Sequence, residues 1–239
     1  LQHEGVEHAR RFDRAQMRVR QLERRESLVR QALASLSERQ RCQIGHLLIG
    51  LQKKGDRVLS LAGSSFLAVA LAAAGIKPGD HVIVPDYTFA ATANSVVLAG
   101  GVPVFADIDP KTFNLDPNHV ASLITKKTKG IMPVHLYGHI AAMNEINEIA
   151  KKHNLLVFED AAQGHLASLN GKNSGEFSSV ASFSFYPTKN MTAGEGGMCV
   201  TDSAEIARTL KLLRNQGQEI RYKNEIVGFN TRMTDIHAA

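Results

Sequence analysis

An amphipathic helix followed at once by a buried strand is encoded by residues 142–163, which read AMNEINEIAKKHNLLVFEDAAQ. The helical pattern ends at His153, and the four apolar residues 155–158 follow it. A short, continuous apolar run of this kind is typical of a strand that is covered on both faces of a sheet. Glu159 and Asp160 come directly after the predicted strand, which is where ligands bind in open α/β sheets. The stretch therefore predicts a mostly parallel sheet with a functional site beyond the ends of its strands.

The same alternation of short apolar strands and amphipathic helices runs through residues 57–239. We expect strands at 81–84, 102–108, 130–135, 155–158, 180–185 and 197–201, and helices at 64–74, 88–99, 117–126, 142–153 and 204–214. Such a pattern predicts an α/β fold with three layers, α/β/α, in which helices cover both faces of a mostly parallel sheet.

Residues 1–56 differ from the rest of the chain in composition and are treated as a separate, basic and helix-prone segment. They hold 12 Lys and Arg against 7 Asp and Glu, which accounts for the whole formal net charge of +5. The remainder is neutral, so a basic groove through the fold is not supported and we expect no nucleic-acid partner. Within residues 21–40, apolar side chains recur at a spacing of seven. This favours an amphipathic helix over a long coiled coil, because too few heptads are present.

The cysteine content and the apolar runs bear on where the protein resides. Cys42 and Cys199 lie far apart and lack metal-ligand spacing, so we expect neither a disulfide scaffold nor a zinc site, and a reducing cytoplasm is the default. The longest apolar run, residues 66–76, falls short of the roughly 18 residues that span a bilayer. No charged and then apolar leader opens the sequence, so we expect neither a secretory signal nor a membrane partner.

Two stretches that follow strands contain polar side chains whose role is ambiguous. Residues 62–65 read AGSS and lead into a helix, which suits a phosphate because a glycine turn, two hydroxyls and free helix N–H groups coincide. Taken alone, that stretch favours a serine that caps the N-terminus of the helix. The carboxylates of Glu159 and Asp160 are costly to bury unless a cation or hydrogen-bond donors partner them. Taken alone they fit a helix cap or a metal ligand as well.

A lysine follows the strand predicted at 180–185. Pro187 ends that strand and leaves Lys189 in a loop before the glycine-rich residues 194–197. In an apolar pocket the ammonium form would be disfavoured, which makes the free amine a usable nucleophile. A single lysine after a proline is more often a solvated surface residue, and residues 228–230, GFN, indicate by themselves only a turn.

Taken together, these segments resemble the DegT/DnrJ/EryC1/StrS family of sugar aminotransferases, which use pyridoxal phosphate (PLP). The resemblance runs from about residue 57 to 239 and includes GIKPGD (75–80), VIVP (82–85), TF (88–89), ATAN (91–94), PVF (103–105), DID (107–109), PVHLYG (133–138), EDAAQ (159–163), FSFYPTKN (183–190), RNQG (214–217) and GFNTRM (228–233). It implies the aspartate-aminotransferase fold, with a mixed, mostly parallel sheet in its large domain.

The resemblance assigns a role to each of four side chains around the cofactor ring. Lys189 forms the internal Schiff base and, once freed, moves a proton between the substrate carbon and the cofactor. Asp160 pairs with the pyridine nitrogen and keeps it protonated, which makes the ring an electron sink. Gln163 lies against the phenolic oxygen, and Phe89 stacks on the ring face.

The resemblance also implies how the cofactor phosphate is held. Ser64, Ser65 and Ser184 hold it within one subunit, and Asn230 reaches the phosphate in the neighbouring subunit's site. A two-fold homodimer with sites completed across the interface follows from this.

The implied activity is transfer of an amino group, with glutamate as donor, onto a nucleotide-linked keto-sugar in polysaccharide or antibiotic sugar biosynthesis. The family also contains dehydratases with a histidine at the lysine position, and Lys189 argues against that branch. Two alternatives stay open: aminotransfer to a cyclic ketone, and a truncated or non-catalytic remnant or partner subunit.

This sequence departs from the family pattern in four places. Ser64 and Ser65 follow Gly63 where the family usually has Gly-Thr-Ala, which keeps a hydroxyl for the phosphate. Leu166 stands where the family commonly has glycine, a bulky change close to the site. Residues 1–56 do not resemble the N-terminal region that helps gate the sugar site, and the family's small C-terminal domain is expected to be missing after Ala239.

Overall fold

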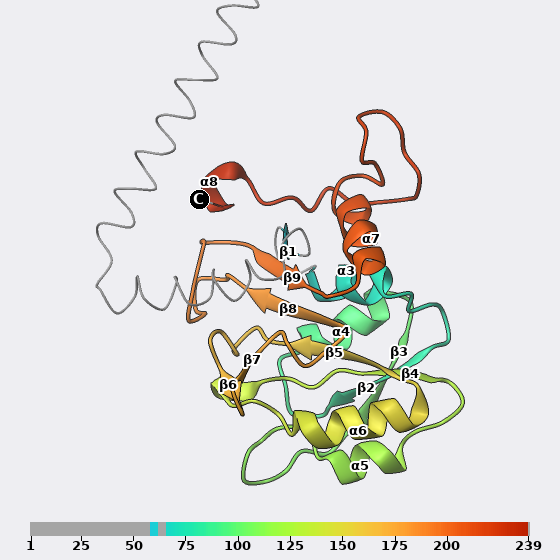
Figure 1. Cartoon of the computed structure of the whole chain (residues 1–239), viewed down its shortest axis with the longest axis vertical. Coiled ribbons are helices and arrows are strands. Elements are labelled where there is room, and N and C mark those ends of the chain that lie inside the picture. The colour runs from blue at the N-terminus through green and yellow to red at the C-terminus, as the bar shows by residue number, and fades with distance from the viewer. Residues whose placement is uncertain (1–57, 62–65, 239) are drawn as a thin grey trace, which may run out of the picture. The chain divides into compact units, whose positions relative to one another are not determined.

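Residues 58–61 and 66–238 are described by a computed structural model of the chain (Figure 1). The predicted basic segment 1–56 lies outside the described residues, as do Ser64 and Ser65. No helix in the described ranges is long and apolar enough to cross a membrane.

A seven-stranded mixed sheet forms the centre of the described chain, with the strand order β1-β9-β8-β5-β4-β2-β3. The strands are β1 (Val58–Leu61), β2 (His81–Pro85), β3 (Val102–Ala106), β4 (Thr128–Ile131), β5 (Leu156–Asp160), β8 (Val180–Ser184) and β9 (Gly197–Val200). Neighbouring strands from β3 to β8 pair in parallel, whereas β9 runs antiparallel to both β8 and β1. The mixed, mostly parallel sheet agrees with the expectation.

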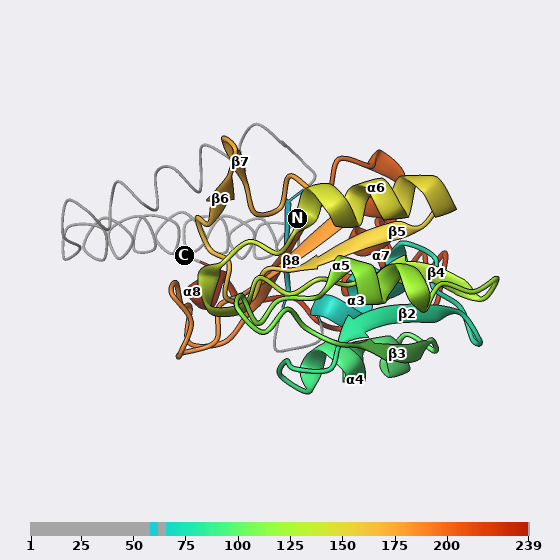
Figure 2. The same ribbon diagram turned by 90° about the horizontal axis from the view of Figure 1, so that it is seen from below.

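Helices cover both faces of this sheet, as Figures 1 and 2 show. The first cluster of buried residues joins one face to α3 (Phe66–Ala73), α4 (Ala91–Leu98) and α7 (Ala204–Arg214), and the second joins the other face to α5 (Pro117–Ser122) and α6 (Met143–His153). Alternation along a strand divides the two faces: Val82 and Val84 belong to the first cluster, and Ile83 between them belongs to the second. The predicted three-layer α/β/α fold is thereby confirmed.

The predicted helices owe their ends to local chemistry. The Asp116 side chain accepts a hydrogen bond from the Asn118 N–H at the start of α5, and the Ser203 side chain accepts one from the Ile206 N–H at the start of α7. Asn154 ends α6 in a left-handed conformation with φ of +54°, which lets the chain turn directly into β5. These caps define where α5 and α7 begin and where α6 ends.

Several elements differ from the expected ranges, and β1 was not predicted. Glu159 and Asp160 are the last two residues of β5 and do not follow it, because the pairing with β8 continues to Asp160 and Ser182. β4 ends at Ile131, before Pro133, which has no N–H to donate to the ladder. A hairpin of β6 (Ser168–Leu169) and β7 (Lys172–Asn173) was not predicted, since its strands are too short to show a pattern.

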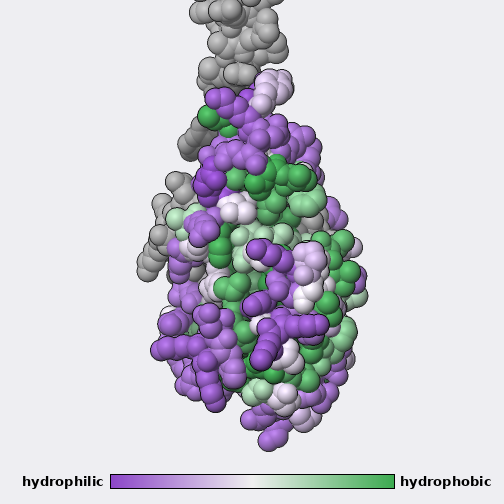
Figure 3. Space-filling view, turned by 90° about the vertical axis from the view of Figure 1, so that its right-hand side faces the viewer, coloured by the Kyte–Doolittle hydropathy of each residue, from purple (hydrophilic) through white to green (hydrophobic). Residues whose placement is uncertain are grey.

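The remaining short elements are the 3-10 turn η3 (Leu136–Gly138) and α8 (Asp235–Ala238). Figure 3 shows the side of the molecule that lies to the right in Figure 1, where patches of apolar residues reach the surface between hydrophilic ones. The carboxyl ends of β5 and β8 point to the left in Figure 1, away from that face.

The packing of α7 on the sheet predicts a contrast between two leucines. Leu210 is fully buried in the first cluster, so Leu210→Ala should lower the free energy of unfolding by about 2–5 kcal/mol. Leu98, on α4, is 76% exposed, and Leu98→Ala should change it by less than about 0.5 kcal/mol. Urea denaturation followed by circular dichroism measures both values, and similar losses in the two variants would contradict this account of the core.

Candidate active site

The two carboxylates at the end of β5 point to opposite faces of the sheet and meet different surroundings. The Glu159 carboxylate accepts hydrogen bonds from four donors: His135 Nε2 (2.8 Å), Gly175 N (2.7 Å), Phe177 N (3.0 Å) and Ser178 Oγ (2.6 Å). Burial opposes its ionisation, but the interactions with His135, Ser178 and Gly175 outweigh burial and lower the pKa of Glu159. Glu159 is therefore a satisfied buried anion.

The hydrogen bonds of His135 define its tautomer. The Ala141 N–H donates to His135 Nδ1 over 3.3 Å, so the ring proton is on Nε2, where it is donated to Glu159. Both side chains of this pair are fully buried. The pair links the end of β4 to the end of β5, and the backbone donors from Gly175 and Phe177 bring in the loop after β7.

Asp160 is buried too, but it has fewer partners. Thr92 Oγ1 donates to Asp160 Oδ2 over 2.8 Å, and the Ala162 N–H donates to Oδ1 over 3.2 Å. Burial raises the pKa of Asp160, and Thr92, Ala162, His135 and Lys189 only partly offset that effect. The pKa values of these two adjacent carboxyls are thus shifted in opposite directions. Asp160 is the one whose ionised form a further cation would stabilise.

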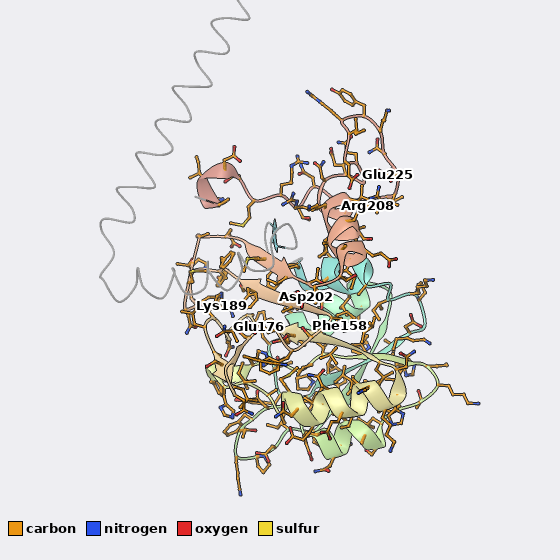
Figure 4. All side chains as sticks on the ribbon, viewed as in Figure 1. Phe158, Glu176, Lys189, Asp202, Arg208 and Glu225 are labelled. Atoms are coloured by element: carbon orange, nitrogen blue, oxygen red, sulfur yellow. The ribbon has the colours of Figure 1, made fainter. Side chains whose placement is uncertain are left out.

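Lys189 lies in the loop that connects β8 to β9, as the sequence predicts. Its backbone N–H donates to the Tyr186 carbonyl over 2.9 Å, and its side chain is half-buried. The ammonium group is close enough to favour ionisation of Asp160 and to disfavour protonation of His165. Figure 4 places Lys189 at the end of the sheet toward which β5 and β8 run, far from the exposed Arg208–Glu225 ion pair.

His165 is a buried imidazole that the sequence analysis did not assign. Its ring packs against Phe183 and Phe185 at centroid distances of 5.6 and 5.9 Å. Neither ring nitrogen makes a hydrogen bond within the described part of the chain. Burial, and then the Lys189 cation, lower the pKa of His165 to about 4, with a weaker opposing effect of the Ser184 backbone. The ring is therefore neutral at neutral pH.

Gln163 and Ser184 lie at the same end of the sheet. The Tyr137 N–H donates to Gln163 Oε1 over 2.7 Å, which leaves the amide N–H groups of Gln163 as its donors toward a ligand. Ser184 is buried at the last position of β8, and its hydroxyl accepts a weak hydrogen bond from the Tyr186 N–H over 3.3 Å. The structure thus gathers four predicted residues, Asp160, Gln163, Ser184 and Lys189, at the ends of β5 and β8.

The other predicted residues are less closely tied to this group. Phe89 is 73% exposed and comes just before α4, the helix whose Thr92 binds Asp160. Asn230 is exposed and forms a bridge with Asn215. Ser64 and Ser65 lie outside the described residues. The roles of all eight residues remain predictions.

Three contributors to the site were missed from the sequence: Thr92, His135 and His165. Thr92 and His135 stand inside motifs that the sequence analysis singled out, but their partners are Asp160 and Glu159, 68 and 24 residues away. For His165, its place two residues after Gln163 was the available signal. No cluster of three or more potential metal ligands occurs among the residues that were placed.

Residues 57–239 match the model of the DegT/DnrJ/EryC1/StrS aminotransferase family. The chain belongs to this family. GDP-perosamine synthase of Caulobacter vibrioides is 52% identical over 179 residues, which cover 74% of this chain and 48% of that protein. The pleiotropic regulatory protein of Geobacillus stearothermophilus is 49% identical over 178 residues, with the same shares of the two chains.

A solved structure of NtdA from Bacillus subtilis with the cofactor PMP bound superposes with a TM-score of 0.72 at 37% identity. The match covers 76% of this chain and 42% of that one. The chain spans about half the length of the curated relatives that it matches.

Leu166, which the sequence analysis singled out as a departure from the family pattern, has a left-handed backbone. Its φ is +61°, in the left-handed region that glycine adopts without cost. Leu166 follows His165 directly, so the strained turn lies immediately beside the site.

The contrast between the two carboxylates predicts opposite effects of neutral replacements in the cofactor-free protein. Glu159→Gln puts an amide among four donors and should lower the free energy of unfolding by about 3 kcal/mol or more. Asp160→Asn removes a poorly compensated buried charge and should leave it within about 1 kcal/mol of wild type or raise it. Denaturant titration at neutral pH measures both, and a larger loss for Asp160→Asn would refute the assignment.

The raised pKa of Asp160 also predicts how that comparison changes with pH. A carboxyl whose pKa is higher in the folded than in the unfolded protein stabilises the fold at low pH, and that contribution is lost as the pH rises toward the folded value. Wild type should therefore gain stability relative to Asp160→Asn as the pH falls from neutral into the acidic range. Unfolding curves of the two cofactor-free proteins at matched pH values test this, and a pH-independent difference would contradict it.

Proposed function

We propose that the protein is a PLP-dependent aminotransferase that moves an amino group from glutamate onto a nucleotide-linked keto-sugar. The observation that carries the proposal is Asp160, a buried carboxylate with two donors and a raised pKa, within electrostatic range of Lys189. A protonated ring nitrogen would supply the cation that Asp160 lacks. Membership of the family, the PMP in NtdA and the name of GDP-perosamine synthase support cofactor and substrate class.

The residues at the ends of β5 and β8 fit this cofactor. Asp160 would hold the ring nitrogen and its proton, and Gln163, whose Oε1 is occupied by the Tyr137 N–H, would donate an amide N–H to the ring oxygen. Ser184 would donate its hydroxyl to the phosphate, because that hydroxyl otherwise only accepts a weak hydrogen bond. Ser64 and Ser65 are proposed to complete the phosphate site, with Phe89 on the ring face.

The bound cofactor supplies an aldehyde that takes up the amino group and a ring that withdraws electrons from the reacting carbon. Lys189 would act as the general base and acid, with its ε-amine moving the proton at the carbon that bears the amino group. The neutral His165 helps this step indirectly, since it adds no second positive charge beside Lys189. Asp160 stays ionised when a cation faces it, which keeps the ring nitrogen protonated.

We propose a homodimer in which Asn230 of one subunit reaches the cofactor phosphate of the other. The exposure of Asn230, despite its backbone bridge to Asn215, supports a role outside its own subunit. We also propose a cytoplasmic location, which agrees with the free thiol of Cys199 in the sheet.

A second candidate is a non-catalytic protein that keeps the PLP-binding fold. It is favoured by the 49% identity to a relative named a pleiotropic regulatory protein. The two candidates differ in turnover: an aminotransferase converts glutamate and a nucleotide-linked keto-sugar, whereas a non-catalytic protein takes up PLP without doing so.

The lysine assignment predicts where PLP becomes attached. The purified chain mixed with PLP should develop visible absorbance, and borohydride should fix a pyridoxyl group on Lys189, as located by peptide mass spectrometry. Lys189→Ala should abolish both signals, because it removes the amine whose charge acts on Asp160. Lys151→Ala, in the last turn of α6, is the matched control and should behave as wild type. Undiminished absorbance and fixation in Lys189→Ala would show that another residue bonds the cofactor.

A further inference from the structure

Three exposed aromatic side chains, Tyr87, Phe113 and Tyr137, form a cluster beside the candidate site, which we call the aromatic platform. The hydroxyls of Tyr87 and Tyr137 are 3.0 Å apart and hydrogen-bonded. The Phe113 ring lies between the two tyrosines, at centroid distances of 5.8 Å from Tyr87 and 6.4 Å from Tyr137. The three side chains are 48%, 42% and 69% exposed in chain order. Clustered exposed aromatic rings are unusual on a protein surface and mark recognition sites.

The platform is held in place from beneath by polar contacts. Buried Asn114 joins the loop of Phe113 to that of Tyr137, since its Oδ1 accepts from Leu136 N (3.1 Å) and its Nδ2 donates to the His139 carbonyl (3.0 Å). Phe113 and Tyr137 both adopt left-handed backbones, with φ of +60° and +55°. Strain of this kind in bulky residues persists where the surrounding structure enforces it, which it often does at functional sites. The rings are thus pre-organised for a ligand.

The platform belongs to the same end of the sheet as Lys189. Its members lie in the loops that follow β2, β3 and β4, which are adjacent parallel strands. The backbone N–H of Tyr137 donates to Gln163 Oε1 over 2.7 Å, so the platform is one hydrogen bond away from a proposed cofactor contact. When the sugar of a nucleotide-linked substrate reaches Lys189, its nucleotide must lie outside the cofactor site.

We propose that the aromatic platform binds the flat base of the substrate's nucleotide by stacking while the linked sugar reaches Lys189. The inference rests on the proposed function, and it names the part of the chain that holds the nucleotide. Base stacking on aromatic rings tolerates every base, because each base has a π face. The hydrogen bond with Tyr87 raises the pKa of Tyr137, so the Tyr137 hydroxyl stays protonated at neutral pH. One hydroxyl proton joins the pair and the other is free to donate to a base carbonyl.

Binding of GDP, UDP and dTDP to the PLP-loaded chain, measured by isothermal titration calorimetry, tests the proposal. Phe113→Ala and Tyr137→Ala should each weaken binding about 5- to 150-fold, the fold-change expected for one lost stacking contact. Phe113→Leu keeps apolar bulk without the π face and should weaken binding as well. Tyr222→Ala, at an 81% exposed tyrosine in the loop after α7, and Phe105→Ala, at a 54% exposed residue of β3, are matched controls expected to bind as wild type.

Visible absorbance of bound PLP and circular dichroism confirm that each variant is folded and loaded. Wild-type affinity in both Phe113→Leu and Tyr137→Ala would overturn the inference, and so would the absence of nucleotide binding by wild type that carries PLP on Lys189. A shift of the platform variants to a smaller species in size-exclusion chromatography, with unchanged nucleotide affinity, would instead make the platform a contact between copies of the chain. Failure of PLP fixation on Lys189 is read separately and rejects the proposed function itself.

Discussion

The burial of two consecutive carboxylates at the end of β5 is the constraint on which the site depends. Strand alternation sends Glu159 to one face and Asp160 to the other, so each must find its own partners. Glu159 obtains four donors, from the end of β4 and from the loop after β7. Its hydrogen bonds therefore join two separate segments of the chain to the central strand. The hydrogen-bonded carboxylate of Glu159 therefore stabilises the segments that surround the neighbouring Asp160.

Asp160 can bind a cationic ligand because it has few hydrogen-bond donors of its own. Thr92 and Ala162 give it two hydrogen bonds, and burial still raises its pKa. The side chains near Asp160 do not fully compensate its charge. Lys189 is half-buried and only partly offsets the effect of burial, and His165 stays neutral. In the proposed function, a cationic ring nitrogen of the cofactor would supply the missing partner. Within the described residues, Asp160 is thus a buried carboxylate whose charge is only partly compensated.

The loops beyond the strands are joined to one another by side-chain amides. Gln163 accepts from the backbone of Tyr137, and Asn114 bridges the loops that carry Phe113 and Tyr137. These amides allow two aromatic residues to keep left-handed backbones at the surface. Leu166, beside His165, holds a third such backbone. The other left-handed non-glycine backbones of the described residues lie elsewhere, at Asn154, Asn170, Gln216 and Tyr222.

The sequence by itself determined the alternation of the main strands and helices, though not β1 or the β6–β7 hairpin, together with the three layers, the family, and the chemical candidates Asp160, Gln163, Ser184 and Lys189. Those features depend on local periodicity and on motifs a few residues long, and the structure agrees on the fold and on bringing these four together. Only the tertiary structure decided which carboxylate is satisfied and which is not, because Thr92 and Asp160 are 68 residues apart and meet through packing of α4 on the sheet. The sequence also did not predict that the ring nitrogens of His165 make no hydrogen bond within the described residues, or that Tyr137 adopts a left-handed backbone. Both features result from long-range contacts that override local preference.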